Sequence, residues 1–202
     1  MISNVSRRAW FGAALIVCAT LFAPALGWAA DAPPAYRVKF DTSRGSFVVA
    51  IARAQAPHGA DRFYDLVRHR YFDGARFYRV VPGFVVQWGY AADPAVTSKW
   101  TGTIPDDPVR ASNVRGTIVF AATGEPNSRS AQLFINYGNN ARLDGLGFAP
   151  LGSVARGMDV VDKIYAGYGQ SPDQGSIAQA GNAYLTKSFP KLDYIKTARL
   201  VK

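Results

Sequence analysis

The sequence predicts an all-β fold, a barrel of about eight strands that is closed at its edges and capped by helices. Three observations lead to this prediction. The chain of 202 residues contains 19 glycines and 12 prolines, and 13% of it is aromatic, a composition rich in turn residues and in residues that favour strands. Short apolar segments alternate with turn residues along the chain. Strand-like alternation also occurs near both ends of the domain, so the first and last strands can close the sheet and leave no exposed edge.

The first 30 residues differ in composition from the rest of the chain. Arg7 and Arg8 are followed by an uncharged stretch, residues 9–30, in which an apolar segment precedes small residues. This pattern is typical of a secretory signal peptide, so we expect residues 1–29 to be removed and residues 30–202 to form one domain. A retained membrane anchor is the alternative, because the uncharged stretch is just long enough to span a bilayer.

Both interpretations place the domain outside the cytoplasm, in the periplasm or secreted, or held at the membrane if the leader is retained. The paired arginines approach a twin-arginine export signal, but two arginines are also common in ordinary signal peptides. The choice between these two export routes stays open.

The domain begins with a predicted β-hairpin. Residues 36–41 alternate between apolar and polar side chains, residues 47–51 alternate in the same way, and turn residues occupy 42–46 between them. A helix should follow, because Pro57 suits a first helical turn. Apolar residues then recur at helical spacing, at Ala60, Phe63, Leu66 and Val67.

The remaining elements are predicted as short strands and one further helix. Residues 76–87 are apolar on both faces, as expected for one strand of a barrel wall. Residues 88–110 and 167–181 are expected to be irregular loops. Further strands are predicted over residues 116–122, 132–136, 151–154 and 193–200, and a helix over residues 158–164.

The sequence lacks most of the residue patterns that carry covalent or cofactor chemistry. Cys18, the only cysteine, lies in the leader, so the mature domain has no thiol. His58 and His69 are about three turns apart on the predicted helix, too far apart to share a metal. No phosphate-binding glycine loop, dinucleotide fingerprint or nucleophile elbow occurs, and Asp106-Asp107 lies between prolines that favour a turn. We expect no cofactor and no metal, and a reaction without covalent chemistry, such as rotation about an imide bond.

The chain is basic, which would favour anionic partners such as nucleic acid, lipid head groups or acidic proteins. Its net charge is +9 at pH 7 and +7 without Arg7 and Arg8, but the lysines and arginines are scattered, which indicates a solvated basic surface. A nucleic-acid binder that stacks bases on Trp88, Tyr90 and Trp100 is an alternative. Export from the cytoplasm argues against it, and no nucleic-acid partner is expected.

One apolar segment contains an unusual arginine. Residues 77–87 read Phe-Tyr-Arg-Val-Val-Pro-Gly-Phe-Val-Val-Gln, with Arg79 near the start. A buried arginine needs partners, because an unpaired internal charge is costly. A structural ion pair is one explanation. The other is a functional groove, since Pro82-Gly83 can bend the strand so that Arg79 and an apolar patch converge.

Residues 77–87 resemble the active-site signature of the cyclophilins. Residues 120–135 and 143–152 resemble the second and third motifs of this family, and the segments at residues 57–63 and 157–161 are similar to its two capping helices. The resemblance runs in order from about Tyr36 to Lys202. It implies a closed eight-stranded antiparallel β-barrel capped by two helices, and peptidyl-prolyl cis–trans isomerase activity that accelerates protein folding.

The resemblance also implies the roles of individual residues. Arg79 matches the catalytic arginine, which would stabilise the twisted imide. Three positions depart from the usual family residues: Tyr78 replaces a His, Val85 a longer Met, and Arg142 a Trp that supports cyclosporin binding, so weak cyclosporin sensitivity is expected. The implied substrate-binding residues are Tyr78, Phe84, Val85, Gln87, Ala122, Thr123, Gln132, Phe134, Leu143 and Phe148.

The expected partners are proline-containing peptides and unfolded or folding proteins, with the protein itself a monomer that does not insert in the membrane once its leader is cleaved. A binding module for proline segments, or a periplasmic chaperone with little turnover, is the alternative function, because a shared fold does not guarantee a shared activity.

Overall fold

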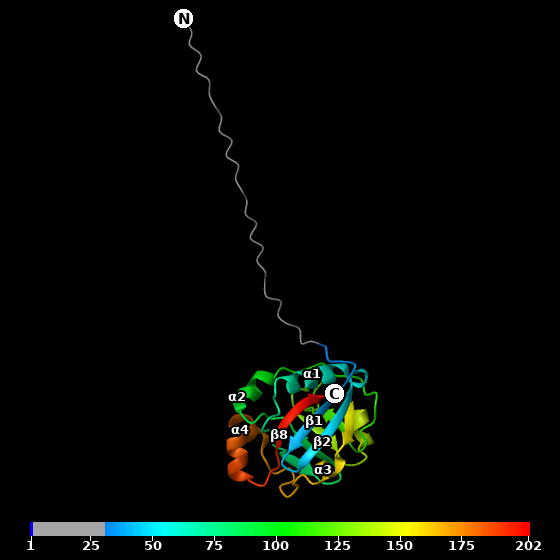
Figure 1. Cartoon of the computed structure of the whole chain (residues 1–202), viewed down its shortest axis with the longest axis vertical. Coiled ribbons are helices and arrows are strands. Elements are labelled where there is room, and N and C mark those ends of the chain that lie inside the picture. Colours follow the sequence, from blue (N-terminus) through cyan, green and yellow to red (C-terminus); the bar gives the residue numbers. More distant parts are fainter. Residues whose placement is uncertain (2–30) are drawn as a thin grey trace.

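The structure is a computed structural model of the whole chain, and it describes Met1 and residues 31–202 (Figure 1). The predicted signal peptide and Cys18 lie outside the described residues. Eight strands form one antiparallel sheet in the order β3-β4-β6-β5-β7-β2-β1-β8. The strands are β1 (Ala35–Thr42), β2 (Gly45–Ala52), β3 (Arg79–Val81), β4 (Val85–Trp88), β5 (Thr117–Phe120), β6 (Leu133–Asn136), β7 (Pro150–Arg156) and β8 (Ile195–Val201).

The sheet curls until the segments before its two end strands meet. Arg76, just before β3, forms an antiparallel bridge with Tyr194, just before β8. Next to this bridge the Gly74 amide donates to the Ile195 carbonyl, and the Ile195 amide donates to the Ala75 carbonyl, both at 2.8 Å. The predicted all-β barrel is therefore confirmed, and the edges of β3 and β8 are partly covered.

Helices lie around the barrel (Figure 1). The predicted helices are present as α1 (Pro57–Arg68), across one end of the barrel, and α3 (Met158–Asp162), at the other. Two more, α2 (Pro94–Thr97) and α4 (Gln174–Ser188), lie side by side at one edge, where the Asn182 amide donates to the Ala92 carbonyl at 3.0 Å. Short 3-10 helices complete the structure: η1 (Arg53–Gln55), η2 (Ser98–Trp100) and η3 (Ala141–Leu146). No helix in the described part of the chain is long and apolar enough to cross a membrane.

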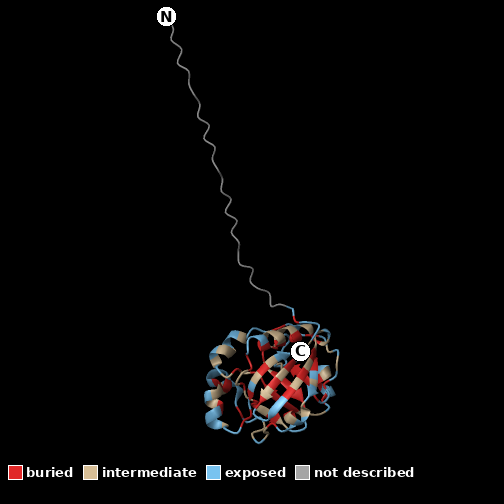
Figure 2. Ribbon diagram, in the orientation of Figure 1, coloured by how far each residue is buried: buried red, intermediate tan, exposed pale blue. Residues whose placement is uncertain are grey.

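Aromatic rings fill the inside of the barrel, where the buried residues gather (Figure 2). The Phe40 ring on β1 stacks on the Phe47 ring on β2 with 4.8 Å between centroids, and it meets the edge of Trp88 at 5.8 Å. Phe63 on α1 and Phe72 also pack against the Phe40 ring. Such rings bury large apolar areas and supply much of the stability of a core.

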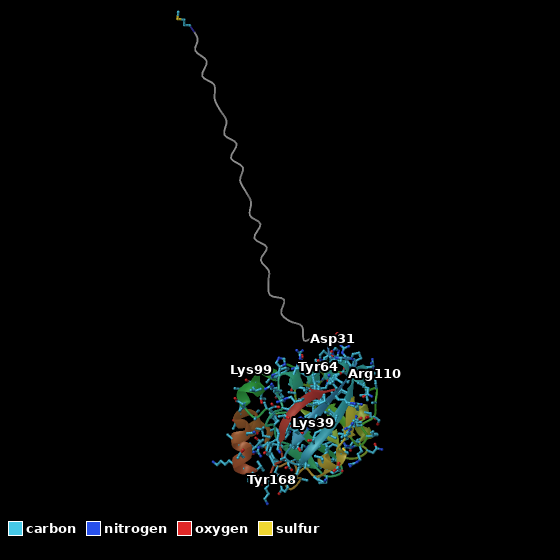
Figure 3. All side chains as sticks on the ribbon, in the orientation of Figure 1. Asp31, Lys39, Tyr64, Lys99, Arg110 and Tyr168 are labelled. Carbon is cyan, nitrogen blue, oxygen red and sulfur yellow. The ribbon has the colours of Figure 1, made fainter. Side chains whose placement is uncertain are left out.

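Charged side chains lie mostly on the outside, and they are dispersed. Lys39, Lys99 and Arg110 occupy well-separated places on the surface (Figure 3). On the outer face of β1, Lys39 Nζ lies 2.8 Å from Asp41 Oδ1. This dispersal agrees with the interpretation of a solvated basic surface.

Three sequence predictions of secondary structure were wrong. Residues 76–87 are not one strand: β3 and β4 form a hairpin in which Val81 pairs with Val85, and Gly83 takes the positive φ of +73° that the turn requires. The predicted loop over residues 167–181 contains the start of α4. The predicted loop over residues 88–110 contains α2 and η2.

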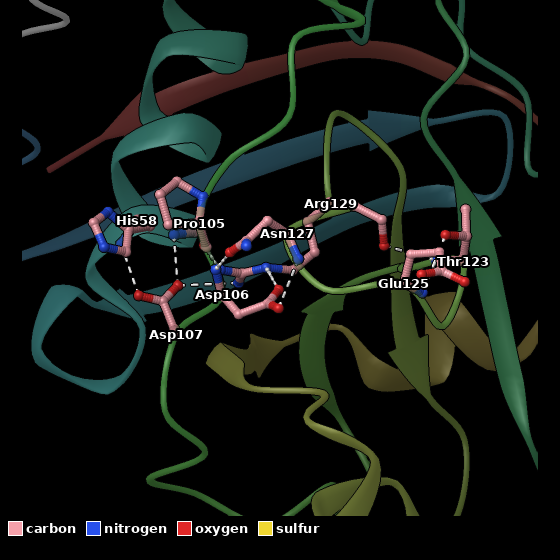
Figure 4. A network of polar contacts seen from close by, with 10 residues as sticks. His58, Pro105, Asp106, Asp107, Thr123, Glu125, Asn127 and Arg129 are labelled. Atoms are coloured by element: carbon pink, nitrogen blue, oxygen red, sulfur yellow. Dashed lines mark hydrogen bonds and ion pairs between the residues drawn. The ribbon is translucent and has the colours of Figure 1, made fainter.

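The expectation that Asp106-Asp107 forms only a turn was also incomplete, because Asp107 joins α1 to a distant loop (Figure 4). Its side chain is 1% exposed and accepts from the His58 amide at 2.9 Å and the Gly59 amide at 2.8 Å, which satisfies the first turn of α1. Arg129 Nη1, from a side chain 3% exposed, donates to the same carboxylate at 3.0 Å. Arg129 also donates to the Pro105 carbonyl, and its Nε lies 3.4 Å from Asp106.

Candidate active site

A cavity of about 380 Å³ opens on the outer side of strands β4 and β6. Strand alternation explains its position, because Val86 and Trp88 point into the barrel core while Val85 and Gln87 point to the other side. The cavity is lined by Arg79, Phe84, Val85, Gln87, Ala121, Ala122, Thr123, Ser128, Ser130, Gln132, Phe134, Leu143, Phe148 and Gln174. The structure thus brings together every predicted site residue except Tyr78.

One part of the cavity is apolar and separate from the barrel core. Val85, Phe134 and Leu143 are buried in one cluster with Val119, and the Phe148 ring meets Phe134 edge-on at 5.9 Å. Phe84 and Ala121 pack against the same cluster. The Phe134 and Phe148 rings and the aliphatic side chains beside them form a rigid apolar surface, against which a small saturated ring can pack.

Arg79 lies beside this apolar cluster, half-buried at the start of β3. Its Nη1 donates to Gln87 Oε1 at 3.0 Å, its Nε donates to Gln170 Oε1 at 3.3 Å, and its guanidinium carbon is 5.6 Å from the centre of the Phe84 ring. Within residues 31–202 no carboxylate pairs with it. The alternative of a structural ion pair for Arg79 is therefore wrong, and among the described residues its positive charge faces the cavity without a neutralising partner.

Tyr78 lies behind the cavity and does not line it, which corrects the expectation that it contacts substrate. Only 1% exposed, it packs with Ile177 and Leu185 of α4. Its hydroxyl accepts from Gln87 Nε2 at 2.7 Å and donates to Gln132 Oε1 at 2.5 Å. Burial raises the pKa of Tyr78 well above its usual value, so the phenol keeps the proton that it donates. Tyr78 therefore orients the two glutamines that do line the cavity.

The opposite side of the cavity is polar and belongs to the loop between β5 and β6. Thr123, Ser128 and Ser130 line it, and the Thr123 amide donates to the Ser128 hydroxyl at 3.1 Å. Arg129, between the two serines, does not line the cavity, and its side chain reaches the buried carboxylate of Asp107 (Figure 4). The ion pair with Asp107 therefore holds this loop in place.

Gln132 is fixed by a close backbone approach as well as by Tyr78. Gly89 has φ +131°, and a Cβ at this position would lie 2.3 Å from the Cα of Gln132. No other residue fits there.

Arg142 lies at the rim of the cavity. It is exposed on η3, and its guanidinium carbon is 4.8 Å from the centre of the Phe84 ring. Phe84 is thus flanked by two arginines, since Arg79 also lies over it.

Sequence reasoning missed some lining residues for different reasons. Ala121, Ser128 and Ser130 belong to the second motif, so that stretch contained a signal for them. Gln174 lies in a segment predicted as loop, where no pattern pointed to the cavity. Metal ligands do not gather in the described part of the chain, since no three His, Cys, Asp or Glu side chains there could hold an ion.

Comparisons with known proteins identify the family of the chain. The family model for "Cyclophilin type peptidyl-prolyl cis-trans isomerase/CLD" matches residues 37–181. Peptidyl-prolyl cis-trans isomerase A of Dickeya dadantii is 35% identical over 167 residues, which cover 79% of this chain and 85% of that protein. A probable peptidyl-prolyl cis-trans isomerase of Brucella abortus is 32% identical over 171 residues, which cover 79% of this chain and 86% of that protein.

Solved structures show the same fold at lower identity. A cyclophilin-type isomerase from Cryptosporidium parvum superposes with a TM-score of 0.63 at 20% identity, covering 83% of this chain and 98% of that one. Cyclophilin AquaCyp293 from Hirschia baltica gives 0.62 at 18% identity, covering 83% of this chain and 74% of that one. By its sequence match, its barrel and its cavity, the chain belongs to the family of cyclophilin-type peptidyl-prolyl cis–trans isomerases.

Proposed function

We propose that Arg79 catalyses the isomerisation by donating a hydrogen bond to the proline nitrogen of an X–Pro bond as the bond twists. The observation that carries this proposal is a guanidinium without a carboxylate partner in the described residues, placed beside an apolar cluster. The proline ring occupies that cluster, formed by Val85, Phe134, Leu143 and their neighbours. The imide nitrogen then faces Arg79.

The proposed interaction strengthens along the reaction. Resonance makes the planar imide nitrogen a poor acceptor, and twisting the bond localises a lone pair on that nitrogen. The hydrogen bond from Arg79 is therefore stronger in the transition state than in either ground state, which is what catalysis requires. Gln87 holds the guanidinium from one side, so little reorganisation is needed.

The demand on the site is modest. An uncatalysed X–Pro bond isomerises in roughly 10–100 s at 25 °C. A turnover of about 10 s⁻¹ requires two to three decades of acceleration, or roughly 3–4 kcal/mol. One charge-assisted hydrogen bond contributes about 1.5–3 kcal/mol, and exclusion of water by the apolar cluster strengthens it.

The test is NMR exchange spectroscopy on a short Ala–Pro peptide with catalytic amounts of protein. Arg79→Ala should slow the catalysed exchange by about tenfold to a hundredfold, the equivalent of one charge-assisted hydrogen bond. Arg37→Ala, which removes an exposed arginine on β1, is the matched control and should leave the rate unchanged. Normal turnover in Arg79→Ala would sink the proposal. Line broadening that scales with protein concentration, without exchange in the wild type, would favour a proline-binding module.

We further propose that the enzyme acts outside the cytoplasm on unfolded or folding proteins. Support comes from the leader pattern, in which Arg7 and Arg8 precede an uncharged apolar stretch. Fusion of residues 1–40 to a reporter that is active only after export tests the location. The double substitution Arg7→Lys with Arg8→Lys should block export only if the twin-arginine route is used. A reporter that stays inactive with the natural leader would contradict export.

A further inference from the structure

The chain between α3 and β8 approaches the active site at two points. The Gly169 carbonyl accepts from the Val80 amide at 2.8 Å, so this segment covers the outer edge of β3, an end strand of the sheet. Five residues later, Gln174 begins α4 and lines the cavity. The family motifs in the sequence assign no role to this segment.

Gln170 contacts the catalytic arginine directly. Its Oε1 accepts from Arg79 Nε at 3.3 Å, while Gln87 Oε1 accepts from Nη1 at 3.0 Å. A guanidinium has five N–H donors, so two uncharged acceptors fix its plane and leave three donors for substrate. An amide acceptor also leaves the positive charge intact, whereas a carboxylate would offset it.

Gln174 lines the cavity, and its side-chain amide carries an NH₂ group that can donate. Its Oε1 accepts from the Tyr90 hydroxyl at 3.4 Å, which directs the amide nitrogen away from Tyr90. Within residues 31–202 the Nε2 of Gln174 has no protein acceptor. Thr123, Ser128 and Ser130, which line the cavity outside the apolar cluster, are polar as well. A peptide whose proline ring occupies the apolar cluster has backbone carbonyls that need such donors.

Helix α4 is anchored firmly enough to act as a wall. Asp173 Oδ1 accepts from the Ser176 amide at 2.8 Å and caps its first turn. Ile177 and Leu185 are buried in one cluster with Tyr78, the residue next to Arg79. The start of α4 and the start of β3 therefore keep a fixed relation.

We propose that residues 169–174 form a further wall of the active site, in which Gln170 is a positioning residue for Arg79 and Gln174 donates a hydrogen bond to a backbone carbonyl of a residue next to the substrate proline. The part concerning Gln170 rests on the proposed role of Arg79. The part concerning Gln174 requires only that the peptide occupies the cavity.

The test compares Gln170→Met and Gln174→Met with the control Gln179→Met. Gln179 is an exposed glutamine on α4, the helix that Gln174 begins, and Gln179 does not line the cavity. Rates are measured by exchange spectroscopy over a range of Ala–Pro peptide concentrations. Gln174→Met should raise KM about threefold to tenfold and leave kcat nearly unchanged, as expected for loss of one hydrogen bond to bound peptide. Gln170→Met should lower kcat by a similar factor without raising KM, and Gln179→Met should change neither.

A purely structural role for Gln170 is separated by the ¹⁵N relaxation of Arg79 Nε. The order parameter of this N–H should fall in Gln170→Met and recover in Gln170→Glu, which keeps an acceptor oxygen at the same reach. Unchanged order and unchanged kcat in Gln170→Met would overturn the role of Gln170, and an unchanged KM in Gln174→Met would overturn that of Gln174.

The Arg79→Ala background separates the role of Gln170 from the role of Arg79. Gln170→Met in an Arg79→Ala background should cause no further loss, because Gln170 acts through Arg79. A further loss in the double variant would contradict that route. Full turnover in Arg79→Ala alone would refute the arginine mechanism, while the KM of Gln174→Met would still decide whether α4 contacts the peptide.

Discussion

Asp107→Asn should destabilise the protein much more than Arg129→Met, although the two side chains form one buried ion pair. The asymmetry follows from what each substitution leaves behind. Without Arg129, the Asp107 carboxylate still accepts from the His58 and Gly59 amides at the positive end of α1. Without the Asp107 charge, the Arg129 guanidinium stays buried with only the Pro105 carbonyl and the partly exposed Asp106.

The magnitudes can be worked from these contacts. Breaking a buried ion pair by removing one partner costs roughly 3–5 kcal/mol, which we expect for Asp107→Asn because the partly exposed Asp106 compensates the remaining charge of Arg129 only weakly. In Arg129→Met the methionine fills much of the same space and the carboxylate keeps two donors, so about 1–2 kcal/mol is expected. For a domain of this size 1 kcal/mol corresponds to roughly 2–4 °C in Tm. Asp107→Asn should therefore lower Tm by about 6–20 °C, and Arg129→Met by about 2–8 °C.

Urea unfolding monitored by the fluorescence of the fully buried Trp88 measures both variants. Arg115→Met is the matched control, because Arg115 pairs with Asp162 at 2.7 Å on the surface, where both side chains are close to half-exposed. It should lose less than about 1 kcal/mol. Equal losses in Asp107→Asn and Arg129→Met, or a larger loss in Arg129→Met, would refute the argument that the α1 amides hold the carboxylate.

Because no Asp, Glu, His or Cys of the described part of the chain lines the cavity, kcat/KM should be flat from about pH 6 to 9, and a bell-shaped profile would reveal a titrating group in the reaction. Tyr78→Phe removes the hydroxyl that joins the two cavity glutamines and should lower kcat/KM by about tenfold in the exchange assay, whereas an unchanged rate would show that their orientation does not matter. Burial raises the pKa of Tyr36, Tyr78 and Tyr137 above the usual value of about 10, so the unfolded chain loses these protons first. The stability that these three protonated tyrosines contribute is thus complete below about pH 10 and falls as the pH rises further. A urea midpoint that stays constant from about pH 9 to 11 would contradict this expectation. Cyclosporin should inhibit the wild type only weakly, and Arg142→Trp should bind it more tightly; nanomolar inhibition of the wild type would refute this expectation.

Secondary structure was predicted most accurately for the elements that bury only one face. In the first hairpin Phe47, Val49 and Ile51 alternate with outward residues, so both the strand and its core face were evident. Residues 76–87 gave no such signal, because β4 packs on the barrel core with one face and on the apolar cluster of the cavity with the other. With both faces apolar, alternation could not show that Pro82-Gly83, expected only to bend one strand, is the turn between two strands.

The missed parts depend on contacts between distant segments. Helix α4 buries only Ile177, Gly181 and Leu185, and at Gly181 its backbone leaves the helical conformation, so no regular apolar period marks it. Asp107 appeared as a turn residue because Arg129 follows it by 22 positions, and nothing local indicates that they meet. The cavity residues could be grouped only because they fall within family motifs, since spacing alone does not place Val85 beside Phe134.

The pairing of β1 has a consequence for the kinetics of folding. Phe40 on β1 pairs with Phe47 across a tight turn, but on its other side it pairs with Ala198, 158 residues later in the chain. Until β8 arrives, β1 presents an open strand edge that can pair with other chains. Closing so long a loop has a high entropic barrier, which makes barrel closure a late and slow event. While the chain is being made, β1 therefore stays open to aggregation until β8 is available, long after its own hairpin has formed.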